Sequence, residues 1–451
     1  MNNEKNTNTF GATLNMRGKM RRAGVRTADY LKVNGKQNMI IIGATIFLFI
    51  IFTIINPSYA ESSNLLTMVK SFVPYAILGL GVTFVIATGG IDLSIGTVMF
   101  ASSVIAGAIV GSSTTMTSNL WLAIPIMILV GLLFGFLNGF LVAKCKLPPF
   151  IATLGTMLFS RGISAVISQV ITGASTAVKY PSTGWLQSVF SNLNGFPIGL
   201  VWVLGLTVIC MVLMFKTKVG RYILSIGSNE EATRLSGIDV DKFKMIAYVI
   251  GGLFAGIAAI FWTATNPSIP LSEGSGKELD AIAGVYIGGT STTGGFASIV
   301  GTIFGAIILV VIRQGLNFML VQFNSTLSPT FITYAVTGVI VVGAVLLDVL
   351  KRQSANRVRQ EKKAEKFARK TKERIAELNL EKDYALSAKG NAEADKRVKE
   401  IDEEIASLKA ELKNKLPALK AEDMAEAEEE KKRKDEIKAA EKSEKHALKN
   451  K

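Results

Sequence analysis

The sequence has little of what a metal centre, a disulfide framework or a large water-soluble core requires. Its single histidine is His446, and its two cysteines, Cys145 and Cys210, have no ligand-type spacing. These absences argue against a structural zinc site and a disulfide scaffold, and we expect no bound metal. Residues 39–350 contain only 13 Lys or Arg and 10 Asp or Glu, which is too few for a soluble domain of that size.

The charges that the middle of the chain lacks are concentrated at its two ends. Residues 1–38 contain eight Lys or Arg, and residues 351–451 contain 29 Lys or Arg and 23 Asp or Glu. A helix that crosses the ~30 Å bilayer core needs ~20 mostly apolar residues, and several uncharged runs in the middle approach that length. We predict a basic cytoplasmic segment at 1–38, a transmembrane domain at 39–350 and a charged cytoplasmic helical tail at 351–451.

The predicted fold class is all-α: a polytopic membrane protein with about ten transmembrane helices and a charged helical or coiled-coil tail. Positive charge collects in the loops 144–148 and 216–244, which predicts that these loops and both chain termini are cytoplasmic. The eighth segment is the weakest, and we keep it because the charged tail would otherwise be outside. The predicted segments are 39–55, 70–88, 95–111, 120–143, 149–171, 196–215, 245–264, 279–293, 297–318 and 330–350.

The motif GGIDLSIG, residues 89–96, places a carboxylate inside an apolar stretch. An ionisable side chain at the centre of a membrane helix costs at least ~2.5 kcal/mol, so Asp92 needs a polar environment. The two glycines interrupt the helix, and Asp92 with Ser94 can cap a new helix that starts near Ile95. Structural capping is favoured over direct contact with a substrate. Residues 89–101 resemble residues 294–306, either as an internal repeat or by chance.

Other polar residues of the apolar middle are candidates for a translocation pathway. The segment 276–295 carries Glu278 and Asp280 at its start and ends in a turn rich in Gly, Thr and Ser. The alternative is an interfacial helix cap followed by a re-entrant turn. Arg161 either pairs with one of the acids or extends toward the membrane surface. The candidate pathway residues are Asp92, Ser94, Arg161, Asp280, Thr290 and Thr292.

The longest predicted cytoplasmic loop, residues 216–245, contains a short helix signal. Ser228 to Glu231 match a Ser-x-x-Glu capping box, and Gly237 can end the helix in a left-handed conformation. A helix this short is marginal by itself and needs other contacts to hold it. It is either an ordinary surface helix or a docking element for a soluble partner.

The chain lacks the motifs of an energy-converting enzyme. The nearest string to a phosphate-binding loop, SEGSGKE at 272–278, does not have the required spacing of glycines and lysine. No nucleophile-elbow, metalloprotease or dinucleotide-binding motif occurs either. Energy for transport would therefore come from an ion gradient or from another subunit. We expect no cofactor bound by this chain and no catalytic residues.

Four motifs in order resemble the membrane subunit of bacterial ABC importers for monosaccharides, the group that includes ribose, xylose and galactose permeases. They are GGIDLSIG, PPFIATLGTMLFSRGIS, GRYILSIGSNEEATRLSGIDVDKFK and ELDAIAGVYIGGTSTTGGFASIVGTIFGAIILVVIRQGLN. Together they fall within residues 40–350. The third motif is the most specific, and the details of the third and fourth favour ribose-type members, with galactose and xylose also open.

The resemblance implies a multi-pass subunit of the bacterial cell membrane, embedded in lipid and paired with a second permease subunit, often as a homodimer. It implies a separate ATPase that uses ATP and Mg²⁺, and an extracytoplasmic sugar-binding protein, with no role for nucleic acid. The substrate path would pass near Asp92 and the 288–295 turn. The implied ATPase-coupling helix contains Ser228, Asn229, Glu230, Glu231, Ala232, Thr233, Arg234 and Gly237.

Alternatives remain at this point. Permeases of the wider group carry nucleosides or branched amino acids, and a gradient-driven secondary transporter could use Asp92 and Asp280 as ion sites. A membrane scaffold or an enzyme with a coiled-coil tail is the third alternative.

The tail departs from the family, whose members end shortly after the last helix. Residues 374–386 and 397–416 have helical periodicity, a turn is predicted at 387–392, and Pro417 is expected to end the second helix. The tail is either a helical hairpin or a solvated charged segment. The apolar positions of the second helix are Val398, Ile401, Ile405, Leu408 and Leu412.

Overall fold

The computed structural model divides into two compact units, Met1–Val349 and Leu350–Lys451. We call them the membrane unit and the tail unit and describe each by itself. The residues that the structure describes are 35, 37–111, 119–173, 176–271, 276–323, 363–387, 396–422 and 424, with short pieces between 331 and 346. The basic N-terminal segment and most of the tenth predicted segment lie outside the described residues.

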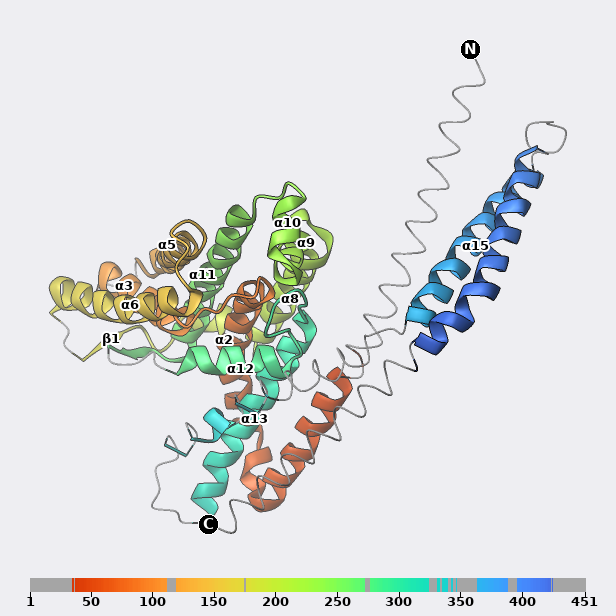
Figure 1. Cartoon of the computed structure of the whole chain (residues 1–451). Helices are drawn as coiled ribbons and strands as arrows, with labels where there is room; N and C mark the ends of the chain where they lie inside the picture. Colours follow the sequence, from red (N-terminus) through yellow and green to blue (C-terminus); the bar gives the residue numbers. More distant parts are fainter. Residues whose placement is uncertain are drawn as a thin grey trace, which may run out of the picture. The chain divides into compact units, whose positions relative to one another are not determined.

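Long apolar helices build the membrane unit (Figure 1). Within the described residues, seven helices are long and apolar enough to cross a bilayer. They confirm seven of the predicted segments, with boundaries that differ by up to eight residues. They are Gln37–Ile55, α2 (Ser62–Ala87), Leu120–Ala143, which contains α5 (Ala123–Ala143), α6 (Pro149–Thr172), α8 (Gly199–Lys216), α11 (Val240–Thr265) and α13 (Ile299–Gln322).

Two further apolar helices are shorter. The third predicted segment is α3 (Ile95–Val110), and the eighth contains α12 (Lys277–Ile287). With 11 residues, α12 is about 16 Å long, roughly half the thickness of the bilayer core. The segment predicted at 279–293 is therefore a shorter helix followed by a turn, and not one continuous helix. The helix ends because Gly288 and Gly289 follow it, the second with a left-handed φ of 92°.

Glycines bring α5 and α11 into close contact at the centre of the unit. Gly131 and Gly135 of α5 face Gly252 and Gly256 of α11, so closely that a Cβ atom on any of them would meet backbone atoms of the other helix. Small residues permit such packing between membrane helices, where van der Waals contact supplies much of the attraction. The same α11 also packs against α2 and α3 and anchors the core.

The connecting segments contain short helices and strands, among them a small sheet that the all-α prediction did not include. Strand β1 (Ala177–Lys179) pairs antiparallel with β2 (Ser268–Pro270). Next to β1, the Tyr180 hydroxyl donates to the carbonyl oxygen of Ser103 on α3 at 2.6 Å. The other short elements are the 3₁₀ helices η1 (Pro57–Ala60) and η2 (Leu120–Leu122), and the helix α7 (Trp185–Phe190).

The tail unit contains two helices that lie side by side, α15 (Lys363–Ser387) and residues 396–422 (Figure 1). Leu378 is buried against Ile401 and Ile405 between them, which confirms the predicted helical hairpin. Most of the predicted turn lies outside the described residues. The prediction that Pro417 ends the second helix was wrong. Because Pro417 is exposed, water can satisfy the carbonyl that loses its helical partner.

Candidate functional site

The short predicted helix of the 216–245 loop is α10 (Glu230–Leu235), preceded by α9 (Lys218–Ser228). Its N-cap is Asn229, whose side-chain oxygen accepts from the Ala232 amide at 2.9 Å. The predicted Ser228 cap was wrong by one residue, because Ser228 ends α9 and donates to the Leu224 carbonyl. The left-handed ending is confirmed, since Gly237 has a φ of 78°. We refer to α10 as the coupling helix, after the role that the sequence resemblance implies and that stays a prediction.

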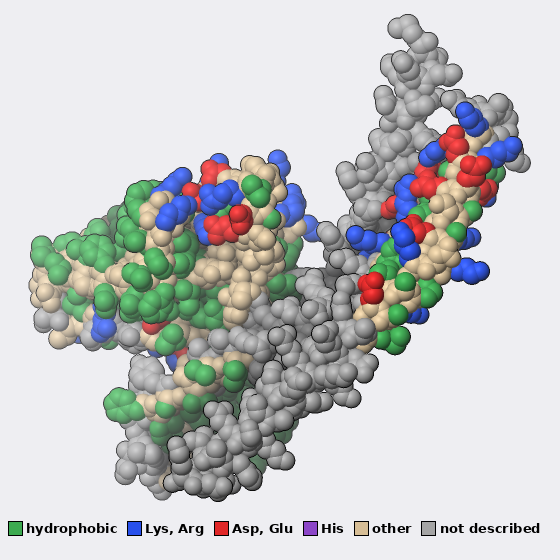
Figure 2. All heavy atoms as spheres, in the orientation of Figure 1, with side chains coloured by type: hydrophobic (Ala, Val, Ile, Leu, Met, Phe, Trp, Pro, Cys, Tyr) green, Lys and Arg blue, Asp and Glu red, His purple; other side chains and the backbone are tan. Residues whose placement is uncertain are grey.

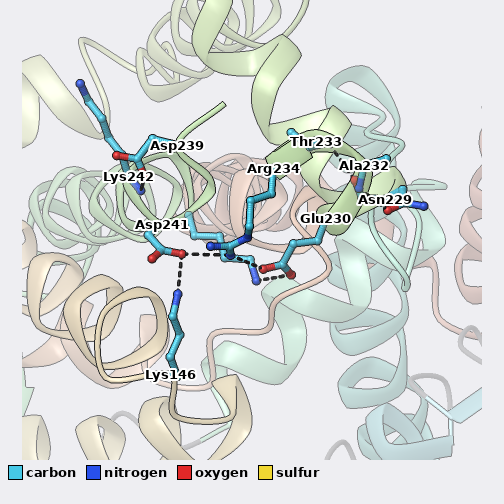
Figure 3. A network of polar contacts seen from close by, with 10 residues as sticks. Lys146, Asn229, Glu230, Ala232, Thr233, Arg234, Asp239, Asp241 and Lys242 are labelled. Atoms are coloured by element: carbon cyan, nitrogen blue, oxygen red, sulfur yellow. Dashed lines mark hydrogen bonds and ion pairs between the residues drawn. The ribbon is translucent and has the colours of Figure 1, made fainter. Parts of the chain in front are cut away.

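Ion pairs hold the coupling helix to its surroundings (Figure 3). Glu230 accepts from Lys244 at 2.6 Å and from Arg234 at 3.3 Å. Arg234 also reaches Asp241 at 3.3 Å, and Asp241 accepts from Lys146 at 2.5 Å. Since Lys146 follows α5 and Asp241 begins α11, this chain of charges joins three separate segments. A short helix that is marginal alone is stabilised in this way.

The electrostatics of Glu230 follow from these neighbours. Partial burial by itself would raise the pKa of the Glu230 carboxyl, but hydrogen bonds and positive charge from Lys244 and Arg234 together lower that pKa below its usual value. The carboxylate is therefore ionised at neutral pH. Its side chain remains 44% exposed, so solvent screens each of these ion pairs.

The outward side of the coupling helix is open to solvent. Leu235 is 84% exposed, and Glu231 and Ala232 are exposed beside it. Figure 2 shows Lys, Arg, Asp and Glu side chains gathered around α9 and α10, whereas hydrophobic side chains cover the neighbouring flank of the unit. A groove of about 350 Å³ runs between α9 and α10. It is lined by Leu224, Ser225, Ser228, Asn229, Ala232, Thr233, Ser236 and Ile238.

The inward end of α9 contacts two breaks in the membrane helices. A Cβ on Gly227 would collide with the Ala87 carbonyl at the end of α2 and with the Gly295 amide after α12. Gly294 in turn lies against Gly89, and the Gly295 amide donates to the Ala87 carbonyl at 3.0 Å. The two similar Gly-Gly motifs of the sequence thus meet each other directly beneath the coupling helix.

Asp92 occupies the first of these breaks and is 2% exposed. It accepts from the Ser94 amide at 2.8 Å and from the Ser94 hydroxyl at 2.7 Å. Ser94 is the N-cap residue of α3, but its hydroxyl bonds Asp92 instead of a helix amide. Asn138 of α5 donates to the same hydroxyl at 2.7 Å. Ser94 makes no side-chain cap bond and Asp92 bonds the N-cap residue itself, so these contacts order the chain before α3 and tie it to α5, and the capping role stays a prediction.

The remaining pathway candidates lie at different places. Thr290 is buried and accepts from the Ser298 amide at 3.0 Å, which closes the turn before α13. Thr292 is half-buried in the same turn. Asp280 pairs with Arg313 at 2.5 Å, and Arg161 lies on the exposed side of α6. The structure therefore does not gather these candidates into one cavity.

Sequence reasoning did not assign several residues that the structure brings together around Asp280. Arg313 of α13 also donates to the Tyr75 hydroxyl of α2 at 2.9 Å, and its guanidinium lies 5.5 Å from the Tyr75 ring centre. Lys277 lies over the ring of Trp262 at 5.3 Å. The charge of Arg313 inside an apolar run was the signal that could have pointed to this cluster, but its partners are set by tertiary packing.

Comparisons with known proteins agree with this architecture. Residues 64–349 match the family described as "Branched-chain amino acid transport system / permease component". The ribose import permease protein RbsC of Escherichia coli K12 is 36% identical over 313 residues, which cover 68% of this chain and 92% of that protein. The Bacillus subtilis protein of the same name is 37% identical over 304 residues, 67% of this chain and 89% of its own.

Another relative is named for a different sugar, fructose. The fructose import permease protein FruF of Bifidobacterium longum is 36% identical over 282 residues, 62% of this chain and 77% of that protein. No solved structure matches the chain. The family match spans the membrane unit from α2 onward and includes both Gly-Gly breaks and the coupling helix. The chain therefore belongs to this family of ABC transport permeases, as a multi-pass membrane subunit.

Proposed function

We propose that the chain is the permease subunit of an ATP-driven importer that moves a monosaccharide, ribose by preference, into the cytoplasm by alternating access. The observation that carries this proposal is the similarity of the membrane unit to import permeases for ribose and fructose. Galactose and xylose remain alternatives within the class. Both chain termini lie in the cytoplasm, as the distribution of positive charge favours.

A separate ATPase supplies the energy and is the partner of the coupling helix. An exposed leucine on a short helix with a single buried side chain suits a surface that another protein covers, because Leu235 would gain burial there. ATP and Mg²⁺ belong to that subunit, and this chain contributes no catalytic residue. An extracytoplasmic sugar-binding protein delivers the substrate on the other side of the membrane.

The contacts of α9 provide a route from the ATPase to the membrane helices. A displacement of the coupling helix moves α9, and Gly227 of α9 touches backbone at both helix breaks. Backbone atoms touch backbone atoms at both breaks. A movement of α9 is therefore transmitted to the breaks directly, because no side chain between them could change rotamer instead. Glycines 89 and 294, both with left-handed φ values, are the hinges on which α2, α3 and the turn before α13 would reorient.

A second copy of the permease would cover the exposed side of α6. Arg161 lies about 18 Å and 16 Å along the helix from its two ends, further from either surface than an arginine side chain extends. A lipid-facing charge at that depth is unfavourable, so this side of α6 faces protein or a water-filled path. We assign it to the interface between two subunits, where protein would shield Arg161 from lipid.

The experiment that tests the function is sugar uptake into proteoliposomes that contain the permease, its ATPase and its binding protein. ATP-dependent accumulation of ribose is the expected result. Uptake without the ATPase that collapses with an uncoupler contradicts it and indicates a secondary transporter. Uptake of a branched-chain amino acid in place of sugar would follow the family description instead.

Variants of the coupling helix test the role of this surface. Leu235→Asp and Glu231→Lys should abolish sugar-stimulated ATP hydrolysis while the protein still inserts in the membrane. Gly237→Pro should act similarly, because proline cannot adopt the left-handed φ of that position. Leu204→Ala, at a position of α8 that is 66% exposed, is the control and should leave coupling intact. Normal coupling in all three variants would remove the helix from the ATPase interface.

A further inference from the structure

The first turns of two short membrane helices meet in the interior of the membrane unit. Gly96 lies in the first turn of α3, and a Cβ there would come within 2.6 Å of both the amide nitrogen and the Oε2 atom of Glu278, in the first turn of α12. The amide groups of both helix starts carry partial positive charge. The Glu278 carboxylate therefore lies between two helix N-termini, at what we call the α3–α12 junction.

Two polar groups at this junction are buried without a partner. Glu278 is 4% exposed; its Oε1 accepts from the Gly276 amide at 2.8 Å, but its Oε2 has no partner among the described residues. Trp262 of α11 is 9% exposed, and its indole N–H likewise has no partner there. A buried polar group without a hydrogen bond is destabilising. One open acceptor and one open donor are complementary to a ligand hydroxyl, which can fill both roles.

The helix α3 places these two groups at a defined spacing. Gly96 contacts Glu278, and Phe100 packs edge-on against the Trp262 ring with centroids 5.2 Å apart. Positions 96 and 100 are four residues apart and share one face of α3, roughly 6 Å from each other. The Glu278 carboxylate and the Trp262 ring thus contact α3 at two positions that are one turn apart.

The charged side chains around the junction sum to zero, and this indicates which class of ligand the junction would bind. Lys277 and Arg313 contribute two positive charges, and Glu278 and Asp280 contribute two negative charges. Arg313 is already engaged by Asp280 and Tyr75. Lys277 lies over the rings of Trp262 and Tyr75, at 5.3 Å and 5.9 Å. A balanced site with aromatic walls favours a neutral, hydroxyl-rich molecule over an anion or a cation.

We propose that the α3–α12 junction is a binding site for the transported neutral sugar inside the permease, an assignment that rests on the proposed function. A sugar hydroxyl donates to Glu278 Oε2, another accepts from the Trp262 N–H, and the sugar replaces the Lys277 side chain over the indole face. Asp280 and Arg313 position α12 and do not touch the sugar. The site lies apart from Asp92, which is occupied with its own hydrogen bonds.

Conservative variants test the site in the reconstituted transporter. Trp262→Phe keeps an aromatic ring and removes the N–H, and Glu278→Gln keeps the shape and removes the charge. Each should raise the KM for sugar about tenfold, which corresponds to ~1.4 kcal/mol, with a smaller change in kcat. Trp202→Phe is the matched control, because its N–H donates to the Val189 carbonyl at the periphery, and its KM should equal that of the wild type.

The possible results distinguish an error in the proposed binding site from an error in the proposed function. If the wild type transports sugar and both variants have its KM, the junction is not the site and the function stands. If the wild type transports no sugar, the proposed function is wrong. A separate measurement of sugar binding then tests whether the junction is a binding site. For that measurement, Trp121, Trp185 and Trp202 are replaced by Phe in the full-length protein, so that Trp262 alone fluoresces. A saturable change with ribose supports the site, and no change with ribose, xylose, galactose or fructose overturns it.

Discussion

The ion pairs of the coupling helix and those of the membrane interior use the same side-chain chemistry in opposite environments. Lys146, Arg234 and Glu230 are 57%, 51% and 44% exposed, whereas Asp280 is 6% and Arg313 is 21% exposed. Exposed pairs each contribute ~0–1 kcal/mol, but loss of one partner of a buried pair is destabilising by ~3–5 kcal/mol. The coupling helix is thus held by contacts that break and re-form easily, and the interior is not.

The two regions also differ in how tightly they are packed: the membrane interior is the more tightly packed of the two. The interior places glycine backbones of α5 and α11 in direct contact, which leaves no room for movement. The coupling helix has one buried side chain, Thr233, among its described residues. Under the proposed function, this division would let the coupling helix shift with its partner while the helices behind it move as rigid bodies.

The largest effect is expected from Gly252→Val in α11. A Cβ at this position would lie 2.7 Å from the Cα and 2.8 Å from the amide nitrogen of Gly135, so the two helices must separate. Overpacking of a rigid core is destabilising by about 3 kcal/mol or more, and we expect little folded protein in detergent. Size-exclusion chromatography of a fluorescent fusion measures this. Gly155→Ala on α6 is the control, since nothing lies within 4 Å of its Cβ. A monodisperse Gly252→Val protein would show that the close contact is dispensable.

A smaller but still large effect is expected from Arg313→Met. This change leaves Asp280 buried without its partner and removes the donor to the Tyr75 hydroxyl. The expected loss is ~3 kcal/mol, measured as a lower unfolding temperature of the purified protein. The double variant Arg313→Met with Asp280→Leu should recover part of that loss, because no uncompensated charge remains. Additive losses in the double variant would mean that the two residues do not act as a pair.

The long helices could be predicted from sequence because a run of ~20 apolar residues has few other stable forms in a membrane. The same criterion failed for α12, whose segment is apolar enough on average, since Gly288 and Gly289 end the helix and the chain turns back to meet Gly89. The strands β1 and β2 have three residues each, too few to produce a pattern.

The candidate site was predicted in position but not in its contacts. A short helix was predicted here and is confirmed, and its coupling role stays a prediction. Ser228 and Asn229 are both good N-cap residues, and local sequence does not decide between them. Tertiary packing does, because Ser228 lies against Gly295. The pairing of Asp280 with Arg313 joins residues 33 positions apart in sequence and requires the fold to be known.

A modest effect is expected when the exposed network is interrupted at Lys146. Lys146→Met removes one end of the chain of charges and leaves Asp241 with Arg234. Amide hydrogen exchange across residues 230–235 should become faster by a factor that corresponds to less than ~1 kcal/mol, and high salt should have the same effect on the wild type. Lys242→Met is the control, because Lys242 forms no ion pair among the described residues. Equal exchange in Lys146→Met and the wild type would mean that the network does not hold the helix.

The smallest expected effect is a pH dependence of the coupling helix that originates at Glu230. Because its pKa in the folded protein is lower than usual, the contribution of Glu230 is complete above the usual carboxyl pKa and is lost as pH falls through the lowered value. Exchange of residues 230–235, corrected for its intrinsic pH dependence, should therefore accelerate slightly in acid. Glu230→Gln should exchange at the faster rate at every pH. An acid acceleration that persists in this variant would assign the titration to another carboxylate, and Asp241, which bonds both Lys146 and Arg234, would be the next to replace.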